Sequence, residues 1–290
     1  MYRRPREQEG TMRKGWIAGL ALVAWGAMCL PAHAVVFRYR PEVGVVTKYK
    51  VAIAGRATTT MEGVGETMQM EMTGAISYSE KALSETKDTV RVEQTMTGGQ
   101  VTAKVEGESQ TQEMPKGKFV ADMDRRGRLI KVVEADFGDE QGAPDMLSGA
   151  SNLSSLSSFT VFPEGEVKVG DTWSDSLTIP AMPGSPEIKM KFTSRLLQLT
   201  TLADRQVAKI RTNFSGPINL DFPAGEEESA AVQATLEGDM VVYYDYEKSV
   251  YVSGEGSVGM DMKVSMPMPE AEGMGMTMKM VMNLKMGLAK

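Results

Sequence analysis

Apolar residues recur at every second position over long stretches of this chain. Between Val250 and Met268 every even position is apolar or glycine, whereas most odd positions carry serine, aspartate, glutamate or lysine. The same pattern resumes from Met274 to Leu288, after the turn-forming residues 269–273. A period of two is typical of a strand with one buried face, and two such runs joined by a short glycine-containing loop predict a β-hairpin.

Shorter stretches elsewhere alternate in the same way, at 64–78, 90–105, 208–214 and 232–236. A strand of about fifteen residues is about 50 Å long, well beyond the usual five or six residues. Strands of that length must twist and bend at glycines or bulges. The sequence therefore predicts an all-β fold of long curved antiparallel sheets, similar to a half-barrel.

One segment breaks the alternation. Between Ala143 and Phe159 the apolar residues are spaced by three or four, and Pro144 followed by Asp145 is typical of a helix start. We expect one short central helix that covers the concave face of a sheet.

A weak internal echo relates the two halves of the chain. The runs at 68–72, 88–92 and 118–122 resemble, in order and spacing, those at 187–192, 205–210 and 239–243. Two interpretations stay open, a duplication and the general likeness of meandering sheets. Under the first, residues 35–140 form one β-lobe, 141–186 the helix and connection, and 187–290 a second, similar lobe.

The first 34 residues have the features of a signal peptide. Arg13 and Lys14 precede an apolar run that ends at Leu30, and Ala32-His33-Ala34 fits a cleavage site. The apolar run is too short for a comfortable membrane span. We therefore expect an exported protein, periplasmic or extracellular, that does not span the membrane once the signal peptide is removed.

Cleavage after Ala34 would remove Cys29 and His33, the only cysteine and the only histidine. Thiol and imidazole catalysis, histidine zinc sites, disulfides and haem ligation are then excluded. The remaining 256 residues carry 27 basic and 36 acidic side chains, a formal net charge of −9. Nucleic acid is a poor partner for such a chain. The arginines at 125, 126 and 128 are expected in a solvated turn. We predict no enzyme activity, no cofactor and no catalytic residue.

A short segment resembles other exported proteins. Residues 162–173 read Phe-Pro-Glu-Gly-Glu-Val-Lys-Val-Gly-Asp-Thr-Trp. A Val-Gly-Asp-x-Trp stretch with alternating strands on both sides resembles a group of uncharacterised exported bacterial proteins and lipoproteins. Their sheets look similar to the half-barrels of lipoprotein carriers, and this resemblance implies a fold but no activity. From the residues themselves, we expect Gly170, Asp171 and Trp173 to play a structural role at a turn that leads into a strand.

Methionine is unusually frequent, with 21 residues after position 34. Methionine has low strand preference and specifies a core poorly, so core packing alone does not explain its choice. A second interpretation is a flexible thioether lining that accepts irregular apolar ligands. A third is Cu(I) binding, although same-strand neighbours about 6.5 to 7 Å apart would need cross-strand partners. No metal ligand is assigned. The candidate ligand-binding residues are Met68, Met70, Met72, Met260, Met262, Met274, Met276, Met278, Met280 and Met282.

The sequence thus predicts a non-catalytic exported protein that binds an apolar small molecule, such as a lipid or acyl chain, in a methionine-lined concave sheet. The alternative is a structural envelope protein, or one that binds a protein partner, without a ligand cavity.

Overall fold

The computed structural model is all-β in the residues that it describes, which are 34–62, 65–114, 116–136, 160–179, 188–223, 229–265 and 275–289. The predicted fold class is confirmed. The strands in chain order are β1 (Val35–Val36), β2 (Val46–Met61), β3 (Thr67–Glu85), β4 (Thr89–Val105), β5 (Glu108–Glu113), β6 (Gly117–Asp124), β7 (Leu129–Asp136), β8 (Glu166–Val167), β9 (Thr172–Ile179), β10 (Ile188–Leu202), β11 (Arg205–Pro223), β12 (Ser229–Asp245), β13 (Val250–Ser265) and β14 (Gly275–Leu288).

Twelve of these strands form one antiparallel sheet in the order β7-β6-β4-β3-β2-β14-β13-β12-β11-β10-β9, with β5 beside β4. The predicted hairpin is present as β13 and β14. The first long strand, β2, pairs with the last, β14, so the two halves of the chain are continuous in one sheet. The division into two similar lobes stays a prediction.

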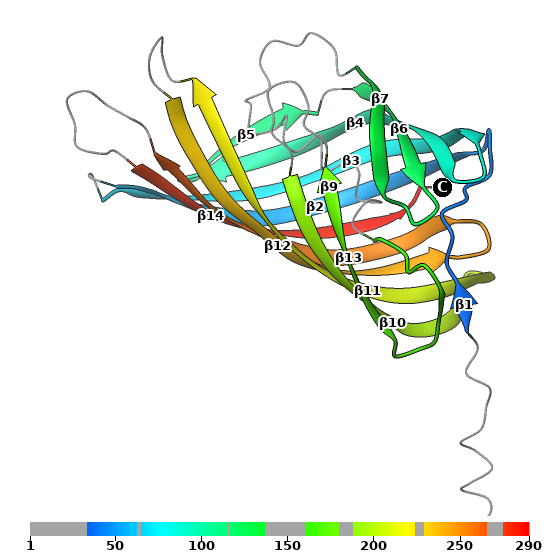
Figure 1. The fold of residues 1–290 in the computed structure, drawn as a ribbon. Coiled ribbons are helices and arrows are strands. Elements are labelled where there is room, and N and C mark those ends of the chain that lie inside the picture. The colour runs from blue at the N-terminus through cyan, green and yellow to red at the C-terminus, as the bar shows by residue number, and fades with distance from the viewer. Residues whose placement is uncertain are drawn as a thin grey trace, which may run out of the picture.

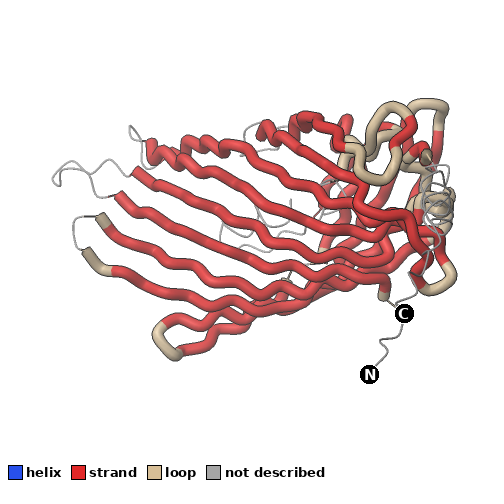
Figure 2. Tube along the Cα trace, turned by 90° about the horizontal axis from the view of Figure 1, so that it is seen from below, coloured by secondary structure: helices blue, strands red, loops and turns tan. Residues whose placement is uncertain are grey.

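The sheet curls along its length (Figures 1 and 2). We call the end with the turns near 87, 126, 204 and 248 the narrow end, and the end where β2 and β13 finish the wide end. A single core cluster includes residues from β6 and from β10, which are far apart in strand order. Those residues can meet only on the concave face, so the core lies on that face.

Glycines on the concave face allow adjacent strands to approach closely. A Cβ atom on Gly256 would meet the carbonyl oxygen of Asp239 and lie 2.7 Å from Cγ of Met240. At Gly238 it would lie 2.6 Å from the carbonyl oxygen of Ser257. Gly259, on the opposite face of β13, has no atom closer than 3.7 Å. Inward glycines covered by a larger neighbour are how curved sheets bend, as strands of this length require.

Two segments outside the large sheet fill the narrow end. Residues 37–41 and 160–163 are joined by the β1–β8 pairing and by main-chain hydrogen bonds to the turn after β6. The Phe37 ring stacks on Phe162 at 5.5 Å between centroids, and Phe162 contacts Tyr244 at 4.5 Å. We predicted that a helix at 143–159 covers the concave face. Those residues lie outside the described part of the chain.

Candidate functional site

The candidate methionines lie side by side on the concave face. Directly paired residues form rows across the strands, such as Met70, Ala57, Met280 and Met260 on β3, β2, β14 and β13. We call the following set the methionine face: Met68, Met70, Met72, Met260, Met262, Met276, Met278, Met280 and Met282. Met274, the tenth candidate, lies outside the described residues. The structure thus brings together residues that are about 190 positions apart in the chain.

The methionine face is on the same side of the sheet as the core but nearer the wide end. Met286, close to the narrow end, is buried at 6% exposure and belongs to the core cluster. Met68 is 42% exposed, and most other members are half-buried. Met282 packs against the core, and Met278 is buried at 6%. The concave face is therefore solidly packed in one half and partly uncovered in the other.

Between Met68–Met72 of β3 and Met278–Met282 of β14, strand β2 contributes only small inward side chains. Gly55, Ala57 and Thr59 lie between the methionines of β3 and those of β14. Ala57 is nevertheless only 2% exposed, and Cγ of Met282 lies 3.0 Å from where a Cβ on Gly55 would be. Methionine side chains from the neighbouring strands thus cover the small residues of β2. Because methionine has three rotatable bonds, this covering can rearrange without moving the backbone.

The convex face opposite is polar. The outward side chains of β2, β13 and β14 near the methionine face are Arg56, Thr58, Glu255, Ser257, Asp261, Lys263, Thr277, Lys279, Val281, Asn283 and Lys285. Such alternation, with one apolar and one polar face, is what an antiparallel sheet with a solvated side shows.

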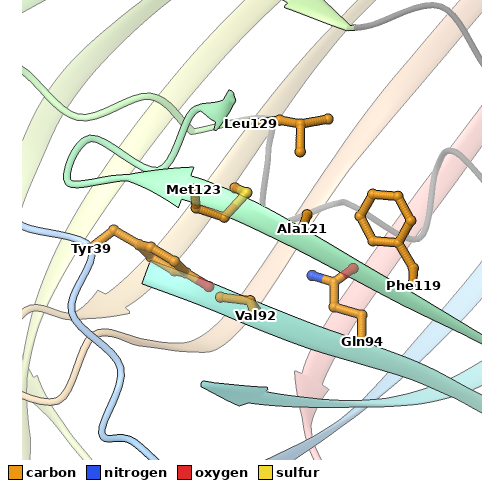
Figure 3. A pocket seen from close by; sticks show the side chains of 7 residues that line it. All are labelled: Tyr39, Val92, Gln94, Phe119, Ala121, Met123 and Leu129. Atoms are coloured by element: carbon orange, nitrogen blue, oxygen red, sulfur yellow. The ribbon is translucent and has the colours of Figure 1, made fainter. Parts of the chain in front are cut away.

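A small hollow lies near the narrow end, away from the methionine face (Figure 3). It is lined by Tyr39, Val92, Gln94, Phe119, Ala121, Met123 and Leu129. The volume that water can occupy within it is about 10 Å³, which is about what one water molecule needs. This hollow is too small for a lipid or an acyl chain.

A carboxyl group is buried beside the hollow. Glu80 on β3 is 5% exposed and accepts hydrogen bonds from the Tyr39 hydroxyl at 2.9 Å and from Nε2 of Gln94 at 3.0 Å. Burial raises the pKa of Glu80 despite the two hydrogen bonds, which lower it. The alternation predicts that Glu80 points inward, but no sequence signal indicated that it is buried under residues 37–41.

Gly170 and Asp171 lie at the turn that leads into β9, and Trp173 is the second residue of that strand. Gly170 has a left-handed φ of 100°, and its amide donates to the Leu196 carbonyl at 2.8 Å. The Asp171 carboxylate accepts from the Lys168 amide at 2.8 Å. The half-buried Trp173 packs against the core, and its indole donates to the Val161 carbonyl at 2.7 Å. These contacts are structural, and they fix β9 against the segment 160–163.

The edge strands β7 and β9 approach each other without joining the ladder. Arg126, in the turn between β6 and β7, forms an ion pair with Asp175 on β9, and each side chain is 15% exposed. Arg126 also donates to the Phe162 carbonyl at 2.7 Å. The expectation of a solvated arginine turn was therefore wrong for Arg125 and Arg126, because they hold the narrow end together.

Comparisons with known proteins add little. No protein-family model and no curated protein matches the chain. Among solved structures, a crystal structure of Pseudomonas aeruginosa OpdQ is similar over 86% of this chain and 100% of that one, with 7% identity and a TM-score of 0.20. A likeness at this TM-score supports no inference. In the part of the chain that the structure describes, no helix has the length and apolar character to cross a membrane.

Proposed function

We propose that the protein is a non-catalytic exported protein that binds an apolar molecule, a lipid or acyl chain, on the methionine face. The observation that carries this proposal is the division of the concave face. One half is a closed core, whereas the other presents half-buried methionines that residues 37–41 and 160–163 leave uncovered. A contiguous apolar surface that is flexible and partly exposed fits an irregular apolar ligand.

The driving force would be burial of ligand and methionine surface with no covalent step. Fully burying one methionine side chain contributes about 1.5–3 kcal/mol. Burial of the ligand itself contributes about 0.8 kcal/mol for each CH₂ group, so a long acyl chain together with several methionines can reach micromolar affinity after the costs of association. The polar convex face leaves the concave face as the apolar side on which such a ligand would bind.

The test is uptake of a long-chain fluorescent fatty acid by the chain from residue 35 onward. Met280→Gln should weaken binding about tenfold, since about 1.4 kcal/mol of apolar contact is lost. Val281→Gln is the matched control, because Val281 is the next residue of β14 but is 54% exposed on the convex face. Its affinity should stay unchanged. Absence of uptake, or equal loss in both variants, would contradict the proposal.

A second candidate is a structural or partner-binding envelope protein. It is favoured by the solid packing of the narrow half and by the small size of the hollow lined by Tyr39 and Phe119. Native mass spectrometry of protein prepared from a bacterial envelope without detergent separates the two. An added mass of lipid size supports ligand carriage, whereas the bare chain from residue 35 supports this second candidate.

A further inference from the structure

The pairing of β13 with β14 places methionines directly opposite one another. Met260 is paired with Met280, and Met262 is paired with Met278. All four lie on the concave face, and we call them the methionine quartet. Opposed residues of an antiparallel pair have Cβ atoms about 4.5–5.5 Å apart, and same-face neighbours along a strand are about 6.5–7 Å apart. The four thioethers therefore start from the corners of a small rectangle.

The pairing register of β13 with β14 places methionines from two strands opposite one another. Two methionines separated by one residue offer ligands from one strand only, whereas an opposed pair can turn sulfurs from two strands toward a shared point. Three rotatable bonds per side chain allow this without backbone movement. The two opposed pairs are adjacent, so all four sulfurs can approach one position above the ladder.

The surroundings of the quartet favour a soft ligand environment. Its paired neighbours on β12 are Leu236 and Ala234, and those on β2 are Ala57 and Thr59. None of these carries a charge. Among the described residues, no group of three or more histidine, cysteine, aspartate or glutamate side chains is placed to hold a metal ion. Neutral thioethers in such a setting select Cu(I) over hard divalent cations.

We propose that the methionine quartet binds one Cu(I) ion through its thioether sulfurs. The quartet is partly accessible from the concave side, since Met260, Met262 and Met280 are half-buried, while Met278 is 6% exposed. This site shares its surface with the proposed apolar ligand but does not depend on it. Metal binding requires sulfur, whereas ligand binding requires apolar area.

Thioether coordination predicts an unusual response to pH. Thiolate and imidazole ligands must lose a proton to bind a metal, so their metal affinity falls in acid. A thioether has no proton to lose. Cu(I) affinity of this protein should therefore be nearly constant between about pH 5 and 8, the range in which a histidine site would weaken.

The experiment titrates the chain from residue 35 onward with Cu(I) in competition with a chromophoric Cu(I) chelator, without oxygen. The native protein should bind one ion. Changing Met260, Met262, Met278 and Met280 together to leucine should weaken binding at least about 100-fold. The control changes Met68, Met70 and Met72 to leucine. These three have the same spacing along β3, but their β2 partners are Thr59, Ala57 and Gly55, so binding should be kept.

Leucine is close to methionine in volume, so the variants should fold, as circular dichroism will check. If the fourfold variant does not fold, Met260→Leu with Met280→Leu removes one pair and should lower Cu(I) affinity about tenfold. The proposal is overturned if the native protein binds no Cu(I), or if the β3 control loses as much affinity as the quartet variant. Cu(I) titration and fatty-acid uptake are measured separately on the native protein. Cu(I) binding without uptake, or uptake without Cu(I) binding, separates failure of one proposal from failure of the other.

Discussion

At the scale of single residues, the inward direction of a side chain and its burial are separate properties. Met70, Tyr78 and Glu80 all point inward from β3. Met70 is half-buried near the wide end, whereas Tyr78 is buried against Tyr49 and Glu80 is buried beside Tyr39. The difference comes from what covers each position. For Glu80 the cover is apolar and aromatic, so a carboxyl group is left with neutral partners.

Glu80 should make stability depend on pH. Its pKa is raised from 4.5 because burial disfavours the ionised form, so between these two values the folded state binds more protons than the unfolded state. The contribution of Glu80 is thus fully present below about pH 4.5 and is lost as pH rises through the folded pKa. Glu80→Gln cannot ionise and should gain stability relative to the native protein as pH rises.

Urea unfolding at several pH values between 4 and 8 measures this difference. The matched control is Glu71→Gln, which removes an exposed carboxylate on the convex side of the same strand. The control should track the native protein at every pH to within a small constant offset. Parallel curves for Glu80→Gln and the native protein would show that Glu80 is not desolvated.

At the scale of the elements, alternation predicted the long strands because the period of two is a local property of the sequence. The predicted runs from Val250 and from Met274 correspond to β13 and β14. The turn around Gly170 could also be predicted from the sequence, since glycine and aspartate have turn preferences of their own. The pairing of β2 with β14 could not be predicted, because no local pattern determines which distant strands become neighbours. The hairpin of β13 and β14 was predicted, but which methionines are opposed depends on its register, and spacing along each strand does not determine that register.

Among the contacts between elements, we expect the one between the β6–β7 turn and β9 to be the most sensitive to mutation. Removing one partner of a largely buried ion pair leaves the other charge desolvated, which costs several kcal/mol at full burial. Because Arg126 and Asp175 are each 15% exposed, we expect a coupling free energy of about 1.5–3 kcal/mol from a double-mutant cycle of Arg126→Ala and Asp175→Ala.

The exposed pair formed by Lys279 and Asp261 is the control for this cycle. Its side chains are 77% and 68% exposed and 4.0 Å apart, so its coupling free energy should be near zero. The urea midpoints of the four proteins in each cycle give the two values. Equal coupling in the two cycles would mean that the contact between β6–β7 and β9 adds no more than a surface ion pair.

At the scale of the whole molecule, one sheet and one core connect the two halves of the chain. The core cluster includes Tyr49 and Val92 from the first half together with Leu196 and Tyr244 from the second. Because the β2–β14 ladder crosses the middle of the sheet, separating the halves would expose two long strand edges. Burial and hydrogen bonding therefore favour a single cooperative unit, even if the sequence echo reflects a duplication.

Cooperative unfolding can be tested with two probes that report different regions. Trp173 is the only tryptophan after residue 34 and lies in β9, at one edge of the sheet, whereas far-ultraviolet circular dichroism reports all strands. We expect both signals to change at the same urea concentration and with the same slope, as two-state unfolding requires. Two independently folding lobes would give a second circular dichroism transition that tryptophan fluorescence does not detect. That result would place the boundary between stable units at the β2–β14 pairing. It would also require the core residues of the second half to pack without those of the first half.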